Sequence, residues 1–374
     1  MNELESLIVL NLVKNLGPVR IRRLIKFFGS ARAVLKKPPA ALERVPGVGP
    51  TLARAIARWE KLEYREEFRL IKKMKIKVVS VFDPDYPENL KEIYDPPSVL
   101  YLRGNLLPRD QRALAVVGSR RASHYGLQAA LKISHQLVNR GFTVVSGLAR
   151  GIDGHAHRGA LMGKGRTIAV LGSGLGNIYP PEHNKLSEEI ASSGAVVSEF
   201  PVRAVPEKTN FPLRNRIISG LSLGVLVVEA AQRSGALITA QLALDQGRQV
   251  MAVPGRIDSF SARGTNQLIQ EGAKMVRDAD DVLEEFEYLS PPEKPSPESD
   301  GSLQPNNMTD EEGKIFALLS EEEKNIEEII GESGLPSGKV SSILLSLELK
   351  RLIKQLPGKF YIKIFPPEKF YNKG

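Results

Sequence analysis

The sequence of 374 residues contains no cysteine and a single tryptophan. The lack of cysteine excludes disulfide bridges, thiolate-bound zinc and a thiol nucleophile, and it fits a reducing cytoplasm. No apolar run approaches the roughly 18 residues that a membrane span needs. The first residues include Glu3 and Glu5, where an export signal would be basic. We therefore expect a cytoplasmic protein without a membrane span.

The net charge of +9 arises in the first part of the chain. Residues 1–80 contain 18 Lys and Arg against 7 Asp and Glu, whereas residues 81–290 are nearly neutral and residues 291–374 are slightly acidic. A basic segment beside a neutral one indicates a polyanionic partner, with a solvated basic face as the alternative. This length and an apolar share of 42% predict two or three globular domains.

Residues 1–76 are typical of a helical domain with an internal repeat. Gly17-Pro18 and Gly49-Pro50 each open a helical pattern, and an arginine follows each pair at the same offset, Arg22 and Arg54. The second copy, VPGVGPTLARAI, resembles a helix-hairpin-helix motif, in which glycines let the backbone approach a phosphate. Two roles stay open for this helix-hairpin-helix or SAM-like domain: contact with DNA, or packing and protein docking.

Residues 81–288 alternate between strand and helix patterns. A proline-rich connection, residues 82–102, leads into apolar runs that are continuous rather than alternating. Such runs predict a parallel sheet covered on both faces, so we expect a doubly wound, Rossmann-like α/β domain. The predicted strands are ALAVVG (113–118), TVVSG (143–147), TIAVLG (167–172), AVVSEF (195–200), GVLVVEA (224–230) and QVMAVPG (249–255).

The last part of the chain predicts a linker and a small domain. Residues 289–308 are rich in proline, serine and charge, which is typical of a linker. Residues 309–374 predict three helices and a hairpin, the composition of a winged helix. The third helix offers only Lys339 in its first turns, which favours a structural or protein-docking role over duplex reading. The helices are predicted to begin at Thr309, Asn325 and Pro336-Ser337, and the hairpin to turn at Pro357-Gly358.

The first candidate site is the strand-to-helix turn in ALAVVGSRRASHYG, residues 113–126. The apolar strand stops at Gly118, and Ser119 and Arg120 follow before a helical pattern. Such a turn directs backbone amides and the positive end of a helix dipole to the carboxyl edge of the sheet. A phosphate would suit the neighbouring arginines. Taken alone, the turn fits simple closure of a βα unit equally well.

A second candidate, KTNFPLRNR, lies between the fourth and fifth predicted strands. Its cations would follow phosphates, and an aromatic ring such as Phe211 stacks a base for about 1–3 kcal/mol without reading sequence. A packed loop corner is the alternative for Phe211. After the fifth strand, Ser234-Gly235 opens another helix on the same edge. The residues expected to contact single-stranded nucleic acid here are Lys208, Thr209, Asn210, Phe211, Arg214, Ser234 and Gly235.

Signals for enzymes and cofactors are weaker. LGSGLGNIYP has Asn177 where a dinucleotide fingerprint has its third glycine, and GALMGKG lacks the Ser or Thr of a phosphate-binding loop. Asp153, His155 and His157 suggest a metal, but ligands two residues apart diverge on a helix. Asp153 also sits where it could cap a helix. We expect no cofactor, no metal and no catalytic residue.

The chain resembles the DprA/Smf family of DNA-processing proteins over essentially its whole length. A C-terminal run, LELKRLIKQLPGKFY, is similar to the winged module of that family. A departure is His183, where many members have Asn. The other runs that carry the resemblance are VVGSRRASHYG, VSGLARGIDGHAHRGAL, TIAVLGSGLGNIYPPEHNKL, KTNFPLRNRIISGLS, VVEAAQRSGALITAQLALDQGR and VPGRIDSFSARGTNQLIQEGA.

The resemblance implies a cytoplasmic, non-enzymatic protein that binds single-stranded DNA without sequence preference through its Rossmann-like domain. It also implies a homodimer formed through that domain, which helps load the RecA recombinase on incoming DNA in natural transformation. In the family a Gly-Ser/Thr-Arg turn and a Lys-x-Asn-Phe-Pro stretch line the DNA pocket. The matching residues here are Gly118, Ser119 and Arg120, and Lys208, Asn210 and Phe211.

Two other function classes stay open. Related Rossmann-like enzymes hydrolyse nucleoside monophosphates and place an acid after the fifth strand, where this chain has Glu229 but lacks their Gly-Gly turn. A winged-helix regulator of transcription would prefer a duplex site.

Overall fold

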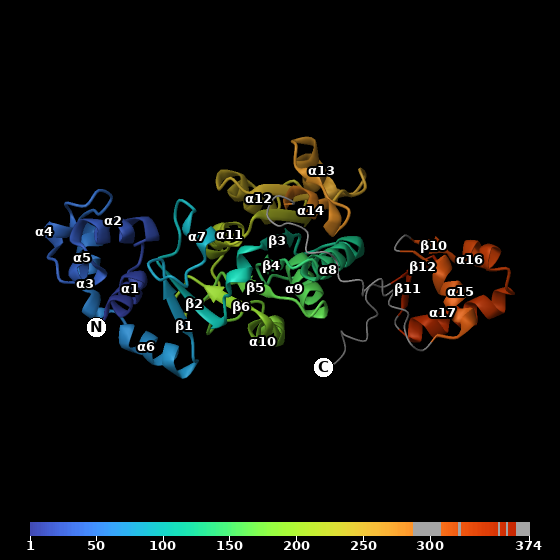
Figure 1. The fold of residues 1–374 in the computed structure, drawn as a ribbon, viewed down its shortest axis with the longest axis horizontal. Coiled ribbons are helices and arrows are strands. Elements are labelled where there is room, and N and C mark those ends of the chain that lie inside the picture. The colour runs from blue at the N-terminus through green and yellow to red at the C-terminus, as the bar shows by residue number, and fades with distance from the viewer. Residues whose placement is uncertain (287–307, 321–322, 351, 357, 364–374) are drawn as a thin grey trace. The chain divides into compact units, whose positions relative to one another are not determined.

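The computed structural model describes residues 1–286, 308–320, 323–350, 352–356 and 358–363 (Figure 1). The chain divides into two compact units, Met1–Val282 and Leu283–Gly374. The predicted domains 1–76 and 81–288 fall largely in the first unit. The predicted linker lies outside the described residues apart from its last residue, Met308. In the described part of the chain, no helix combines the length and the apolar character required to cross a bilayer.

A nine-stranded sheet organises the first unit, with the order β1-β2-β6-β5-β4-β3-β7-β8-β9. The six predicted strands form a continuous parallel run from β6 to β8, so the doubly wound α/β fold is confirmed. From the centre of the sheet, strands β3 to β6 follow one another toward one edge, and strands β7 to β9 follow one another toward the other edge. The strand order therefore reverses between β3 and β7, and doubly wound sheets bind ligands at such a switch point. The strands are β1 (Lys77–Ser80), β2 (Val99–Gly104), β3 (Ala113–Gly118), β4 (Thr143–Ser146), β5 (Thr167–Val170), β6 (Ala195–Ser198), β7 (Gly224–Glu229), β8 (Gln249–Ala252) and β9 (Lys274–Met275).

The sheet extends past the predicted strands at both edges. β1 pairs antiparallel with β2, and β2 pairs antiparallel with β6. At the other edge, β9 pairs parallel with β8. The prediction that residues 82–102 are a connection leading into the sheet is therefore wrong for Val99–Leu102, which are already buried in β2. The prolines just before this run conceal it, because proline argues against a sheet strand.

Helices cover both faces of the sheet because its parallel strands are apolar on both sides. α8, α9 and α10 follow β3, β4 and β5 and lie on one face, while α11 and α12 lie on the other (Figure 1). Apolar residues of α11 and α12 share a core with strand residues such as Val117 and Val225. Ile190 of α10 packs in the opposite core with Val196. The helices of this part are α7 (Glu88–Lys91), α8 (His124–Asn139), α9 (Ile152–Met162), α10 (Asn184–Ser193), α11 (Asn210–Gly220), α12 (Gly235–Asp245), α13 (Arg263–Gln270) and α14 (Ala279–Phe286).

The first 76 residues form helices, as predicted, and the repeat in the sequence is a repeat in the structure. Gly17 and Gly49 precede α2 and α5 with nearly equal backbone angles, φ −78° and −83° and ψ 167° and 173°. A proline follows each glycine, because proline suits the first position of a helix. The helices are α1 (Glu3–Leu12), α2 (Pro18–Phe28), α3 (Ala31–Leu35), α4 (Pro39–Leu42), α5 (Pro50–Ala57) and α6 (Tyr64–Lys73).

The second unit has the helices and the hairpin of a winged helix. Thr309 and Asn325 accept backbone hydrogen bonds at the starts of α15 and α16, which confirms two predicted helix starts. Lys339, the early cation of α17, pairs with Glu311. Its strands pair in the order β10-β12-β11. The elements are α15 (Asp310–Leu318), β10 (Lys324–Asn325), α16 (Ile326–Ser333), α17 (Ser337–Leu349), β11 (Ile353–Leu356) and β12 (Phe360–Lys363).

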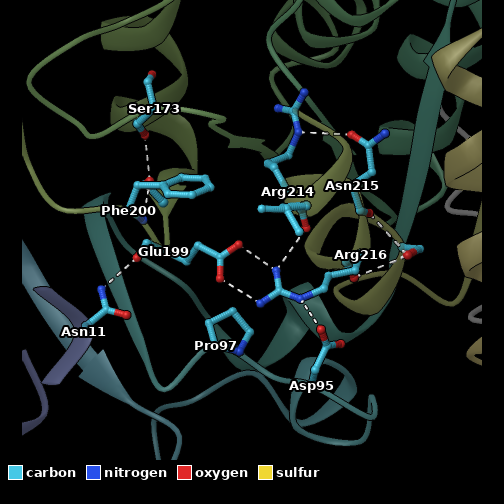
Figure 2. Close-up of polar contacts among 12 residues, drawn as sticks. Asn11, Asp95, Pro97, Ser173, Glu199, Phe200, Arg214, Asn215 and Arg216 are labelled. Carbon is cyan, nitrogen blue, oxygen red and sulfur yellow. Dashed lines mark hydrogen bonds and ion pairs between the residues drawn. The ribbon is translucent and has the colours of Figure 1, made fainter. Parts of the chain in front are cut away.

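A buried arginine fixes α11 against the sheet (Figure 2). The guanidinium of Arg216 donates to both carboxylate oxygens of Glu199, at 2.6 and 2.7 Å, and to Asp95 at 2.9 Å. Burial opposes the charge of Arg216, but Glu199 and Asp95 raise its pKa above the ordinary value. Glu199 follows β6 and Asp95 precedes β2, so this network joins three segments that are distant in the sequence.

We expect Arg216→Met to destabilise the protein by about 3–5 kcal/mol, because it leaves Glu199 largely buried without its partner. Urea unfolding of the full chain, followed by circular dichroism, measures this change. The control is Arg203→Met, which removes an arginine that is 64% exposed and pairs loosely with Glu66; an exposed pair contributes about 1 kcal/mol or less. Equal unfolding midpoints for the two variants would contradict the role of Arg216.

A carboxylate in the second unit makes its stability depend on pH. Glu312 accepts hydrogen bonds from Lys350 (2.6 Å), Ser346 (2.6 Å) and the amide of Thr309 (2.7 Å). These donors, Lys350 foremost, lower the pKa of Glu312 to about 2 from an ordinary 4.5. A lowered folded-state pKa stabilises the fold above the unfolded-state pKa, and this contribution disappears as the pH falls from about 4.5 to about 2.

We expect Glu312→Gln to remove this part of the acid sensitivity. Methyl NMR signals of the core residues Ile315 and Ile343, recorded on the full chain through an acid titration, report the folded fraction of the second unit. Glu311→Gln, which changes the half-exposed neighbouring carboxylate, should keep the wild-type profile. The same acid transition in wild type and Glu312→Gln would contradict the prediction.

Candidate nucleic-acid interface

The turn after β3 places Gly118, Ser119 and Arg120 at the carboxyl edge of the sheet. The register between β3 and β7 shifts at Gly118, so the chain leaves the sheet there. The amide of Ser119 donates to the backbone oxygen of Glu229 (2.7 Å), and its hydroxyl accepts from the amide of Arg121 (3.1 Å). Ser119 thus shapes the turn. Arg120 is exposed, and its amide has no hydrogen-bond partner among the described residues.

The N-terminus of α8 is already occupied by a carboxylate of this chain. Ser123 caps the helix by accepting from the amide of Gly126 (3.1 Å). The amide of Ser123 (2.9 Å) and its hydroxyl both donate to the carboxylate of Glu229, which ends β7 and is 4% exposed. The prediction that this helix dipole faces a ligand phosphate is therefore wrong, because an internal anion takes that place.

The second candidate segment forms the start of α11 rather than a loop. The helix begins at Asn210, and Thr209 precedes it without a side-chain capping bond. The side chain of Asn210 donates to the backbone oxygen of Val205 (3.4 Å), so it holds the approach to the helix. Lys208 and Thr209 are exposed. A cation and the positive end of α11 therefore lie together, an arrangement that attracts an anion.

Phe211 lies where the two candidate segments meet. The guanidinium carbon of Arg120 is 4.9 Å from the centroid of the Phe211 ring, within the range of a cation–π contact. The ring of Tyr179 lies 5.9 Å away between centroids, tilted by 48°. A Cβ on Gly172 would come within 2.7 Å of Phe211 Cδ1, so glycine leaves room for the ring. We call Arg120, Phe211 and Tyr179 the aromatic cluster.

The sequence did not single out Tyr179 as a functional residue. It lies in LGSGLGNIYP, whose glycines invite comparison with a dinucleotide fingerprint that Asn177 does not match. Its position in the chain could have indicated it, because this loop follows β5 and the loops after parallel strands lie at the same edge of the sheet. Tyr179 is 37% exposed and comes from a different segment than either candidate.

Arg214 lies beneath the edge and not on its surface. Its side chain is 3% exposed, and its guanidinium donates to the backbone oxygens of Gly147 (2.7 Å) and Val170, just after β4 and at the end of β5. Burial lowers the pKa of Arg214 to about 10, and the nearby charge of Asp153 opposes that shift. The prediction that Arg214 contacts a ligand is corrected, because its donors are directed to the chain itself. Arg216 is buried in the same way.

Ser234 and Gly235 lie at the start of α12, beside α11. The hydroxyl of Ser234 accepts from the amide of Ala236 (3.3 Å), so Ser234 caps the helix. Gly235 is exposed, and its backbone oxygen accepts from the side chain of Asn215 in α11 (3.5 Å). The sequence correctly predicts a helix start here, next to the helix that carries Phe211.

Asp153, His155 and His157 have separate partners. Asp153 accepts from the amide of Gly147 (3.1 Å), and the N-cap of α9 is Gly151, so the capping role suggested for Asp153 is wrong. A ring nitrogen of His155 lies 2.9 Å from the oxygen of Gly151. Burial lowers the pKa of His155 to about 4 and that of His157 to about 3. Among the residues described, no three His, Asp or Glu side chains are grouped to hold a metal.

Comparisons with known proteins agree with this fold. The family model described as DNA recombination-mediator protein A matches residues 77–287, and the one described as DprA winged helix domain matches residues 290–359. The chain is 37% identical to Protein Smf of Synechocystis sp. over 93% of this chain and 96% of that protein. It is 46% identical to DNA processing protein DprA of Streptococcus pneumoniae over 56% of this chain and 74% of that protein.

Two solved structures share the fold. The X-ray structure of DNA processing protein A from Streptococcus pneumoniae superposes with a TM-score of 0.67 at 36% identity, over 75% of this chain and 97% of that one. A structure of DNA processing protein A from Helicobacter pylori was described for its single-stranded DNA binding mode. It superposes with a TM-score of 0.52 at 28% identity, over 58% of this chain and 98% of that one. With a family model matching more than half of its length, the chain belongs to the DNA recombination-mediator protein A family, the DprA/Smf family.

Proposed function

We propose that this chain binds single-stranded DNA along the carboxyl edge of its sheet, as a binding protein without a catalytic step. The observation that carries the proposal is the aromatic cluster of Arg120, Phe211 and Tyr179, with Lys208 exposed at the start of the same helix as Phe211. Cations that follow phosphates and rings that stack bases are the two requirements of a single-strand site. Membership of the family and the DNA binding of the Helicobacter pylori relative support it.

The proposed contacts separate phosphate binding from base stacking. Arg120 and Lys208 bind phosphates, together with the amide of Arg120 and the open start of α11. Phe211 and Tyr179 stack bases through their ring faces. Because these contacts involve the phosphates of the DNA and the faces of its bases, they do not depend on the DNA sequence but require unpaired bases. Ser234 and Gly235, at the start of α12, extend the phosphate-binding edge.

We infer from family membership that the chain acts in the cytoplasm as a homodimer formed through its sheet domain. In this role it helps load the RecA recombinase on incoming single strands during natural transformation. Two apolar side chains after β8 support a self-contact, since Ile257 is 93% exposed and Phe260 is 66% exposed. Exposed apolar surface of this kind is typical of protein contacts.

The alternative functions receive less support. Hydrolysis of nucleoside monophosphates would need the carboxylate of Glu229 at the substrate, but the amide and hydroxyl of Ser123 bind that carboxylate below the surface. A duplex-reading regulator would need exposed cations on α17, where Lys339 pairs with Glu311.

We expect Arg120→Ala and Lys208→Ala each to weaken binding of oligonucleotides of any sequence. Each lost phosphate contact should reduce the slope of log affinity against log salt by about 0.7 for a single strand. Fluorescence anisotropy of labelled oligothymidine across a salt series measures both quantities. The control is Arg109→Ala, an exposed arginine that precedes β3 at the opposite edge of the sheet. Unchanged slopes in both test variants would remove this edge from the proposal.

We expect Phe211→Leu to lower the affinity for oligothymidine by about 1–3 kcal/mol for a lost stacked base. Tyr179→Leu should weaken binding in the same way, and neither change should alter the salt slope, because no charge is removed. Phe27→Leu is the matched control, since Phe27 is 51% exposed on α2. Wild-type affinity in both the Phe211 and Tyr179 variants would contradict stacking at the cluster.

A further inference from the structure

The N-terminal helices carry a second basic surface, which the proposed function does not use. One turn, at Asn15, precedes α2, and another, at Gly47, precedes α5. The side chain of Arg20 joins them, because its Nε donates to the oxygen of Gly47 (2.9 Å) and its Nη1 donates to the oxygen of Asn15 (3.3 Å). The two turns therefore lie side by side around one exposed guanidinium.

Two more arginines lie at the second turn. Arg23, one helical turn after Arg20, donates to the oxygen of Pro46 (3.4 Å), and Arg54 donates to the oxygen of Pro50 (3.2 Å). Both are exposed. Within the described part of the chain, Arg20, Arg23 and Arg54 form no ion pair with a carboxylate. We call these three arginines, with residues 15–17 and 46–50, the hairpin surface.

The backbone of the second turn adds hydrogen-bond donors. Gly47 has φ +88°, a conformation that favours glycine. Gly47 and Gly49 are exposed, and their amides have no hydrogen-bond partner in the described structure. α5 starts here without a side-chain cap, so its positive end faces outward. Amides and guanidinium groups together are the donors that phosphate oxygens accept.

The two copies of the repeat use their matching arginines differently. Arg22, in the first copy, donates to the backbone oxygen of Tyr94 (2.5 Å) and so attaches the helices to the segment before β2. Arg54, at the same offset in the second copy, is exposed and its guanidinium stays beside the second turn. At this matching position, the first copy therefore anchors the helices and the second copy presents a cation.

We propose that the hairpin surface binds the phosphate backbone of duplex DNA. Backbone contacts alone hold a duplex without reading its sequence, whereas a single-strand site adds ring stacking. The hairpin surface contains no aromatic side chain, so the duplex is the better fit. The excess of positive charge in residues 1–80 has the sign that this partner requires.

The test measures duplex binding while single-strand binding is blocked. A labelled blunt-ended duplex is titrated with the full chain in the presence of saturating oligothymidine. We expect wild type to bind the duplex. The double variant Arg23→Ala, Arg54→Ala should bind the duplex more weakly, and its slope of log affinity against log salt should fall by about 0.9 for each lost phosphate contact. Oligothymidine affinity should stay unchanged. Arg20 is kept, because it bridges the turns.

The control is the double variant Lys72→Ala, Lys73→Ala, which removes two exposed charges from α6 in the same segment. The proposal is overturned if this control weakens duplex binding as much as the arginine pair does, or if oligothymidine displaces the duplex from wild type. Absence of duplex binding at low salt would also overturn it and would favour an acidic protein at this surface. Arg120→Ala separates the two proposals, because it should weaken oligothymidine binding and leave duplex binding intact.

Discussion

The position of α11 depends on two buried guanidinium groups. Arg216 is held by Glu199 and Asp95 (Figure 2). Arg214 donates to backbone oxygens just after β4 and at the end of β5. A buried charge is tolerated only where its donors are satisfied, so each arginine permits few placements of the helix. Phe211 occupies the first turn of that helix and therefore rests over Gly172. The geometry of the aromatic cluster therefore depends on the buried guanidinium groups of Arg214 and Arg216, because they fix the helix that carries Phe211.

Glu229 changes where this doubly wound fold can bind a phosphate. In many such folds the first helix after the switch point receives the phosphate of a nucleotide. Here Glu229 occupies that helix start through Ser123, and a phosphate placed there would meet a negative charge. The proposed function therefore places anion binding further out, at Arg120 and the start of α11. Such a site is more exposed than a nucleotide crevice and suits a polymer that lies across the edge.

The sequence predicts the sheet well because its parallel strands are continuous apolar runs between helical patterns. It predicts the site less well. Arg214 and Lys208 are both basic residues of the same sequence run. Arg214 is buried and donates to backbone oxygens, whereas Lys208 is exposed, and this difference depends on the packing of α11. Tyr179 is not predicted from the sequence, because its proposed role depends on contact with Phe211, which is 32 positions away in the sequence. Pairings of this kind arise only in the folded chain.

The two proposed DNA surfaces belong to one compact unit and share an anchor. Asn11 of α1 donates to the backbone oxygen of Glu199 (3.0 Å), while the carboxylate of Glu199 holds Arg216 in α11 (Figure 2). The same residue thus connects the N-terminal helices and the helix that carries Phe211. A single strand stacked at the aromatic cluster and a duplex held at the hairpin surface would therefore be bound by segments that are fixed to each other. This coupling suits a DNA molecule that is paired along one part and unpaired along the next.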